Sequence, residues 1–155
     1  TEFYLKIILV FSIIALISAY FIEHVLGHQP CNLCLIERIP YGLSIVLTVM
    51  LFILNKNKKF FILLLILTFT FSLVISIYHY GIEEGFFEES AICGVKNFTE
   101  DITKEDLLKQ LNQKIISCKD VTFRIFGLSL TSINIVFSLI FTITLTKIYI
   151  RNEKN

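Results

Sequence analysis

The stretch HQPCNLCLIERIPY, residues 28–41, separates two long apolar runs and decides how the chain is organised. It contains a C-x-x-C pair, Cys31 and Cys34, followed by a glutamate and an arginine. The apolar run after it, residues 39–54, is short for a membrane span, because about 20 helical residues are needed to cross a bilayer. We therefore predict that the second helix begins near Cys34, inside this stretch.

The rest of the chain is equally apolar. Its 155 residues are 55% hydrophobic with a mean hydropathy of +0.74, whereas soluble domains contain about 45–50% apolar residues. The long runs are apolar on all faces, as membrane-embedded helices can be. We therefore predict an all-α membrane protein, a four-transmembrane-helix bundle forming a single domain over residues 1–155, with spans at about 4–22, 34–54, 60–79 and 125–147.

The first apolar run also has some features of a signal peptide. It is longer than the usual apolar region of about 7–15 residues, and no small-x-small cleavage site follows it. We therefore expect it to be retained as a span.

Basic residues set the expected orientation. Residues 55–59 read NKNKK, and the C-terminal tail is also basic. The positive-inside rule places both segments in the cytoplasm, so both termini are expected to be cytoplasmic. Two loops, about 23–33 and 80–124, then lie on the outer side. A net charge of +1 gives no indication of nucleic-acid binding.

The second outer loop contains a helix signal. Thr103 and Asp106 have the spacing of a capping box. The apolar residues that follow fall on one side of a helix, at Leu107, Leu108, Leu111 and Ile115. We therefore predict a short helix lying in the membrane interface.

All four cysteines fall in the two outer loops, Cys31 and Cys34 in the first and Cys93 and Cys118 in the second. Thiols outside the cytosol can persist as disulfides. Four cysteines allow three pairings, and proximity favours Cys31–Cys34 and Cys93–Cys118. A Cys93–Cys118 bond could simply stabilise its loop. A four-residue ring constrains little of the unfolded chain, so redox reactivity better explains the C-x-x-C pair.

Cysteines at such spacings also serve in haem attachment and in metal binding. A c-type haem site requires His directly after the second cysteine, and Leu35 stands there. A metal site is a stronger alternative, because His24, His28, Cys31 and Cys34 form an H-x3-H-x2-C-x2-C run. These ligand types suit zinc or copper, so a membrane zinc- or copper-binding protein is the alternative function.

The start of the second helix would favour a thiolate. Its positive dipole end would stabilise an anion at Cys34. Arg38 lies four residues on, so it shares a helical face with that sulfur and could also bind a carbonyl oxygen of an electron acceptor. It could otherwise serve as an anchor at the membrane surface. Glu37 is expected to pair with Arg38 or to face water. One disulfide at the bilayer and one exposed to a soluble partner would form an electron relay.

The ordered motifs resemble those of the DsbB family, the quinone-dependent disulfide oxidoreductases of the bacterial inner membrane, and the spacing matches through nearly the whole chain. The residues that carry the resemblance are Pro30-Cys31-x-Leu33-Cys34, Glu37-Arg38-x-Pro40-Tyr41, Tyr78-His79-x-Gly81-x-Glu83 before Cys93, and Phe126-Gly127-Leu128-Ser129 after Cys118. The resemblance implies periplasmic cysteine loops.

The resemblance also implies the partners of the reaction. The electron donor would be a DsbA-like periplasmic thiol oxidase, whose thiolate attacks Cys93. The released Cys118 would attack Cys31, and Cys34 would become a thiolate facing membrane quinone, either ubiquinone or menaquinone.

Arg38 would hold the quinone, and His79 would lie near its head group. The chain departs from the family in having no Trp, with Phe86, Phe87 and Phe123 where larger aromatic residues often occur. A relative that uses thiols to reduce a small quinone or an epoxide is a second enzyme alternative.

Overall fold

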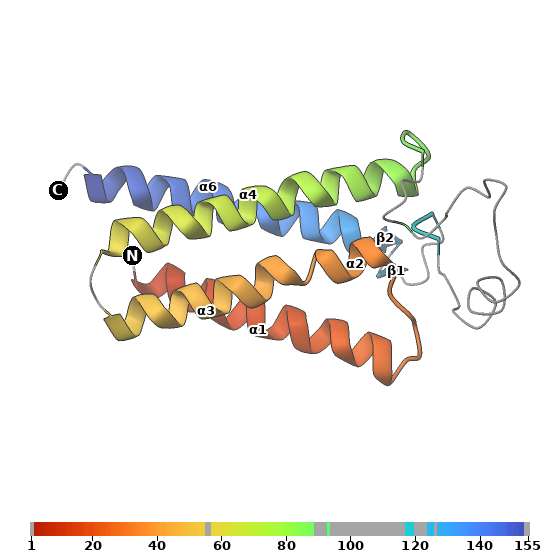
Figure 1. Cartoon of the computed structure of the whole chain (residues 1–155), viewed down its shortest axis with the longest axis horizontal. Coiled ribbons are helices and arrows are strands. Elements are labelled where there is room, and N and C mark those ends of the chain that lie inside the picture. The colour runs from red at the N-terminus through yellow and green to blue at the C-terminus, as the bar shows by residue number, and fades with distance from the viewer. Residues whose placement is uncertain are drawn as a thin grey trace, which may run out of the picture.

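Four long segments form a helical bundle in the computed structural model (Figure 1). Residues 2–54, 57–88, 93, 117–119, 124–125 and 127–153 are described by the structure. The helices are α1 (Glu2–His24), α2 (Asn32–Ile36), α3 (Ile39–Leu54), α4 (Lys58–Glu83) and α6 (Leu130–Glu153). The four segments long and apolar enough to cross a membrane are Glu2–His24, Asn32–Leu54, Lys58–Glu83 and Leu130–Arg151, which confirms the predicted fold class.

The helices run alongside one another, with α1 against α3 and α4 against α6 and α3 (Figure 1). The two termini, the end of α3 and the start of α4 lie at one end of the bundle (Figure 1). The opposite end carries α2 and the cysteines, and is called the cysteine end below. The predicted interfacial helix at residues 103–115 lies outside the described residues.

The second span is interrupted, because α2 ends at Ile36 and α3 begins at Ile39. Pro40 accounts for the interruption, since proline has no N–H for a helical bond and its ring clashes with the carbonyl four residues earlier. The span begins at Asn32, earlier than the predicted start at Cys34, because Cys31 serves as the N-cap and its Sγ accepts a hydrogen bond from the Cys34 N–H at 3.3 Å.

The last helix begins at Leu130 instead of residue 125. A small antiparallel hairpin precedes it, formed by β1 (Arg124–Ile125) and β2 (Leu128–Ser129). The turn needs a left-handed residue, which Gly127 provides with φ of 84°. Ser129 then caps α6, because its Oγ accepts from the Ser132 N–H at 3.2 Å.

Polar side chains link three helices inside the bundle. The Tyr41 hydroxyl on α3 donates to Asn134 Oδ1 on α6, and Asn134 Nδ2 donates to Ser76 Oγ on α4 at 2.8 Å. Ser72 and Ser138 are also hydrogen-bonded, at 3.1 Å between α4 and α6. Interhelical hydrogen bonds between such residues stabilise membrane bundles. They fix how α3, α4 and α6 are rotated beside the site described next.

The apolar core gives a direct test of the bundle. Phe69 on α4 is fully buried, whereas Phe71 on the same helix is 54% exposed. We expect Phe69→Ala to lower the free energy of unfolding by about 2 kcal/mol, because the vacated volume stays partly empty. Burial from lipid adds little, since lipid tails are as apolar as the core. Denaturant titration in bicelles measures the change, with Phe71→Ala as the control. Equal effects in the two variants would contradict the helix packing.

Candidate redox site and cavity

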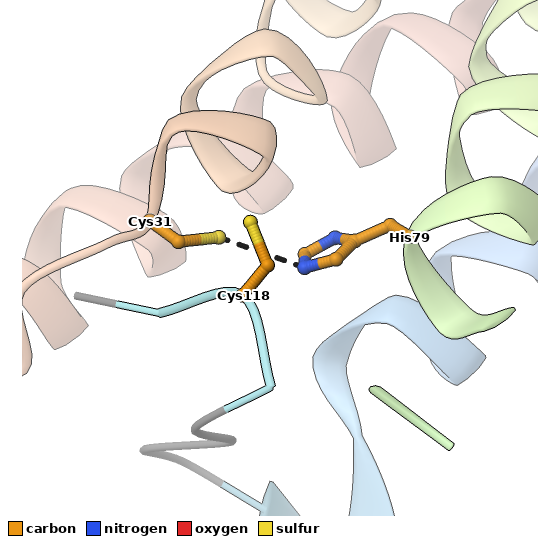
Figure 2. A group of neighbouring side chains, drawn as sticks. All are labelled: Cys31, His79 and Cys118. Carbon is orange, nitrogen blue, oxygen red and sulfur yellow. Dashed lines mark hydrogen bonds between the residues drawn. The ribbon is translucent and has the colours of Figure 1, made fainter. Parts of the chain in front are cut away.

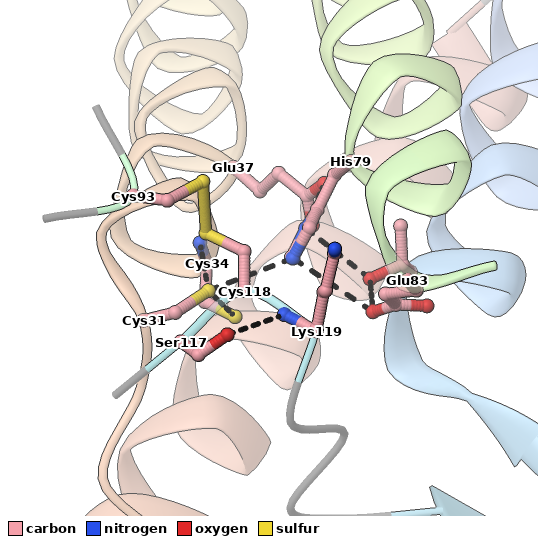
Figure 3. The surroundings of a disulfide bond; sticks show 10 residues. Cys31, Cys34, Glu37, His79, Glu83, Cys93, Ser117, Cys118 and Lys119 are labelled. Carbon is pink, nitrogen blue, oxygen red and sulfur yellow. Dashed lines mark hydrogen bonds and ion pairs between the residues drawn. A yellow bond between two sulfur atoms is a disulfide. The ribbon is translucent and has the colours of Figure 1, made fainter. Parts of the chain in front are cut away.

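A disulfide joins Cys93 to Cys118 at the cysteine end (Figure 3). The two Cα atoms are 5.7 Å apart, within the usual range for a disulfide. Both residues are buried, packed in one cluster with Cys31, Leu33 and Ile82. The pair therefore packs directly against the C-x-x-C segment.

Cys31 and Cys34 are free thiols in this state, with their Sγ atoms 2.7 Å apart. The hydrogen bond from the Cys34 thiol lowers the pKa of Cys31 well below its usual range, and contact with His79 adds to the effect while burial opposes it. A lowered thiol pKa favours the thiolate, which is the nucleophile in disulfide exchange. The favoured anion in this state is therefore Cys31, whereas the sequence predicted Cys34.

His79 on α4 links the sulfur site to a buried carboxylate. Its Nε2 lies 3.5 Å from Cys31 Sγ, and its Nδ1 lies 3.1 Å from Glu37 Oε1. The ring is 1% exposed. Glu37 is buried as well, so the expectation that it pairs with Arg38 or faces water is wrong. The interruption between α2 and α3 turns its carboxylate toward α4.

Figure 2 shows Cys31, His79 and Cys118 converging from three segments of the chain. Their ligand atoms lie within 4.8 Å of one another, and no other group of three possible metal ligands was found in the described part of the chain. The Cys118 sulfur is already bonded to Cys93. The arrangement therefore suits thiol–disulfide exchange between Cys118 and Cys31 better than metal binding.

The structure does not gather the metal set suggested by the sequence. His24 ends α1 on the exposed surface, where its Nδ1 contacts the Tyr20 carbonyl oxygen at 3.1 Å. The chain then turns through Gly27, with φ of 72°, before it reaches the cysteines. His28 lies at the edge of the cavity described below. That zinc or copper site is therefore not formed by His24, His28, Cys31 and Cys34.

Arg38 lies between α2 and α3 and faces α1. Its Nη1 donates to Glu23 Oε2 at 2.5 Å, and its guanidinium lies over the Tyr20 ring, 5.2 Å from the centroid. The sequence predicted a role for Arg38 at the sulfur but missed Glu23. Glu23 could have been noticed in the sequence, because it is an acidic residue at the end of a long apolar run.

Glu83 and Thr131 complete the polar cluster around His79. The Thr131 hydroxyl donates to Glu83 Oε1 at 2.6 Å and lies 3.3 Å from His79 Nδ1. Glu83 is four residues after His79 on α4, and its Oε1 lies 3.8 Å from His79 Nε2. Helical spacing pairs those two residues. No sequence pattern, however, brings Thr131 of α6 to them.

A cavity of about 330 Å³ opens beside the C-x-x-C pair. Its walls come from α1, from the stretch of chain between residue 28 and the first turn of α3, and from α6. The lining is mainly aliphatic and aromatic, and the polar side chains among it include Cys34, Glu37, Arg38, Tyr41, Thr131 and Asn134. A concave apolar site with a few polar groups is typical of small-molecule binding. The described lining does not include His79, which contacts the lining residues Glu37 and Thr131 from behind.

Paired cysteines next to an apolar cavity at one end of a membrane bundle define a membrane thiol oxidoreductase. Comparison with known proteins agrees: the family described as "Disulfide bond formation protein DsbB" matches residues 1–148. The chain is similar to "Uncharacterized protein RP370" of Rickettsia prowazekii (strain Madrid E), with 30% identity over 151 residues, covering 96% of this chain and 88% of that protein. The chain belongs to the DsbB family.

The Cys31–Cys34 hydrogen bond predicts how Cys31 titrates. Because the bond lowers the pKa of Cys31, the thiolate should persist as pH falls below neutrality, until the lowered pKa is reached. We expect alkylation of Cys31 in the reduced protein to have a pH midpoint below 7. Cys34→Ala removes the donor and should move the midpoint toward the ordinary thiol value of about 8.5.

Mass spectrometry after iodoacetamide treatment at a series of pH values measures this midpoint. Cys34→Ser keeps a hydroxyl donor and is the matched control, with an intermediate midpoint expected. An unchanged midpoint in Cys34→Ala would show that the Cys34 thiol does not stabilise the anion.

Proposed function

We propose that this protein is a quinone-dependent disulfide oxidoreductase that reoxidises a DsbA-like periplasmic thiol oxidase. The observation that carries the proposal is the position of the C-x-x-C pair between two different surroundings. Cys31 lies within reach of Cys118, while Cys34 lines the apolar cavity. Electrons entering at the loop disulfide therefore have a short route to a ligand in the cavity.

The proposed location is the bacterial inner membrane, with the cysteine end in the periplasm and both termini in the cytoplasm. Both termini lie at the end of the bundle opposite the cysteines (Figure 1). Lys58 and Lys59, in the first turn of α4, are at that same end, in agreement with the positive-inside rule. The periplasm is oxidising, so reactive disulfides can persist there.

The proposed exchange sequence keeps one bond formed for each bond broken. A donor thiolate attacks Cys93 Sγ, which breaks the Cys93–Cys118 bond and releases Cys118 as a thiolate. Cys118 then attacks Cys31 Sγ of a Cys31–Cys34 disulfide, and Cys34 leaves as a thiolate in the cavity wall. The Cys34 anion predicted from the sequence belongs to this later state, in which Cys31 is bonded to another sulfur. The second donor thiol then attacks the donor sulfur of the mixed disulfide, which forms the donor disulfide and releases Cys93 as a thiolate.

The cavity fits a quinone head group in its size and chemistry. A bound ubiquinone or menaquinone would supply an acceptor for two electrons and two protons. Arg38 is placed to donate a hydrogen bond to a carbonyl oxygen, since its guanidinium has several N–H groups and lines the cavity. Tyr41 and Asn134 are polar groups deeper in the bundle, and Phe11 and Phe137 supply apolar contact with a ring.

The decisive test of the proposal is quinone reduction by the purified protein with a reduced DsbA-type donor. Absorbance of the quinone measures turnover, with ubiquinone and menaquinone analogues tested separately. We expect turnover in the wild type and none in Cys34→Ser, because the sulfur facing the cavity is lost. No turnover by the wild type, or full turnover by Cys34→Ser, would refute the proposal. Donor and quinone without the protein provide the background rate.

Arg38 should act on quinone binding more than on thiol exchange. Hydrogen bonds to charged groups contribute about 1.5–3 kcal/mol. We therefore expect Arg38→Ala to raise the apparent KM for quinone about tenfold or more. Formation of the mixed disulfide between Cys93 and the donor should be largely unchanged, as gel analysis of trapped complexes would record. Arg38→Lys is the control that keeps the charge. Loss of both steps in Arg38→Ala would indicate a structural role through Glu23.

A further inference from the structure

We propose that Glu83, Thr131, His79 and Glu37 form a proton path from the cysteine end of α4 to the cavity, used when the acceptor in the cavity is reduced. This inference rests on the proposed function. Its novel part is the outer half of the path, Glu83 and Thr131, which couples the end of α4 to the histidine behind the cavity.

The reaction requires such a path. Two thiols and one quinone give one disulfide and one quinol, so two S–H bonds are lost, one S–S bond forms and two O–H bonds form on the acceptor. Two electrons pass through the sulfurs, and two protons must reach the cavity separately. Arg38 is not their source, because a guanidinium does not deprotonate in proteins. The remaining walls are mainly apolar.

The four side chains form a continuous series of contacts. Thr131 Oγ1 donates to Glu83 Oε1 at 2.6 Å and lies 3.3 Å from His79 Nδ1. Glu37 Oε1 lies 3.1 Å from the same nitrogen. Carboxyl, hydroxyl and imidazole groups can each accept and donate a proton, depending on their protonation state. A proton held at Glu83 therefore reaches Glu37 through two groups.

The ends of the series face different surroundings. Glu83 is the last residue of α4, at the cysteine end of the bundle. Its side chain is 7% exposed, and its Oε2 is buried without a hydrogen-bond partner in the described part of the chain. An unpaired buried carboxyl oxygen is costly and calls for a functional explanation. Here it is the free position at which a proton from outside is accepted.

At the other end, Glu37 and Thr131 line the cavity while His79 lies behind them. The histidine therefore communicates with a bound ligand through these two side chains. His79 Nε2 also contacts Cys31 Sγ at 3.5 Å, so a proton released by that thiol enters the same series. One cluster thus serves both the sulfur site and the cavity.

The charged and titratable groups around His79 come from several elements. Glu37 comes from the segment joining α2 and α3, Cys31 from the N-cap of α2, and Glu83 from α4 itself. Cys118 Sγ also lies close to the ring, and Lys119 is the next residue along the chain (Figure 3). A pH profile of His79 therefore reports on all of these groups, so the test below uses isotope effects and single carboxyl changes instead.

The experiment compares Glu83→Gln with Glu84→Gln in the complete protein. Glu84 is the next residue and is exposed, so it provides a matched control. With a DsbA-type donor and a soluble quinone, we expect kcat to fall about tenfold in Glu83→Gln, which corresponds to about 1.4 kcal/mol. The solvent deuterium isotope effect on kcat should increase, because proton delivery becomes rate-limiting. Mixed-disulfide formation at Cys93 should be unchanged.

Two further measurements separate proton transfer from a structural role. Formate added to Glu83→Ala should restore part of the rate, whereas a packing defect would not respond to a small acid. The infrared difference spectrum on reducing the quinone-free protein with a phosphine should contain a carboxyl band that is absent in Glu83→Gln and present in Glu84→Gln. This second readout does not depend on turnover.

The outcomes are distinct. Wild-type kcat and isotope effect in Glu83→Gln would overturn the proton path while leaving the proposed function intact. A slow Glu83→Gln with an unchanged isotope effect and no formate rescue of Glu83→Ala would also overturn it, in favour of a packing role. Failure of the wild type to reduce any quinone would refute the proposed function instead, and the infrared comparison would still test whether Glu83 exchanges a proton with the sulfur site.

Discussion

The hydrogen bond between His79 and Glu37 is the contact on which the arrangement of the site depends. Both side chains are buried, and either one without its partner would be an unsatisfied polar group in an apolar bundle. The contact attaches α4 to the segment joining α2 and α3. Glu37 is turned toward α4, and the next residue, Arg38, points toward α1. There its guanidinium donates a hydrogen bond to the Glu23 carboxylate. The orientation of Arg38 in the cavity wall is therefore set in part by the preceding residue, Glu37, whose side chain points to the opposite side.

The short helix α2 places two cysteines, three positions apart, in different surroundings. Cys31, at its N-cap, faces His79 and the loop disulfide, whereas Cys34 faces the cavity. Both cysteines lie before the interruption near Pro40, so this arrangement is set within α2, where the Cys34 N–H donates to the Sγ of the N-cap residue Cys31. The interruption frees the backbone near Arg38 to turn. The sulfur cluster and the cavity consequently lie on two sides of one turn of helix.

Polar side chains inside the bundle form hydrogen bonds with one another. Tyr41 and Asn134 in the cavity wall and the serines of α4 and α6 are linked in this way, so the membrane-embedded part has few unpaired donors and acceptors. Among the described residues, the buried side-chain atoms without a hydrogen-bond partner are Thr48 Oγ1 within α3 and, at the cysteine end, Glu83 Oε2. Its position at the end of the His79 cluster is the reason for assigning it a role in proton transfer and not in packing.

The sequence by itself determined the four spans, because about 20 apolar residues in a row have no stable alternative to a membrane or a large core. It also predicted that Cys31, Cys34 and Arg38 lie close together, since the C-x-x-C spacing and the separation of four positions from Cys34 to Arg38 are local relations. The family assignment follows from the same ordered motifs. The helix boundaries followed less directly from the sequence. Capping by Cys31 starts the second span earlier than predicted, and the hairpin before Leu130 starts the last helix later than predicted.

Only the tertiary structure decided which polar groups are partners. Glu37 meets His79 across 42 positions, and Thr131 meets Glu83 across 48. Sequence periodicity reports neighbours on one element, three or four residues apart, and carries no information on contacts between helices. Burial then makes those distant contacts obligatory, because a carboxylate or imidazole removed from water must find a partner in the fold.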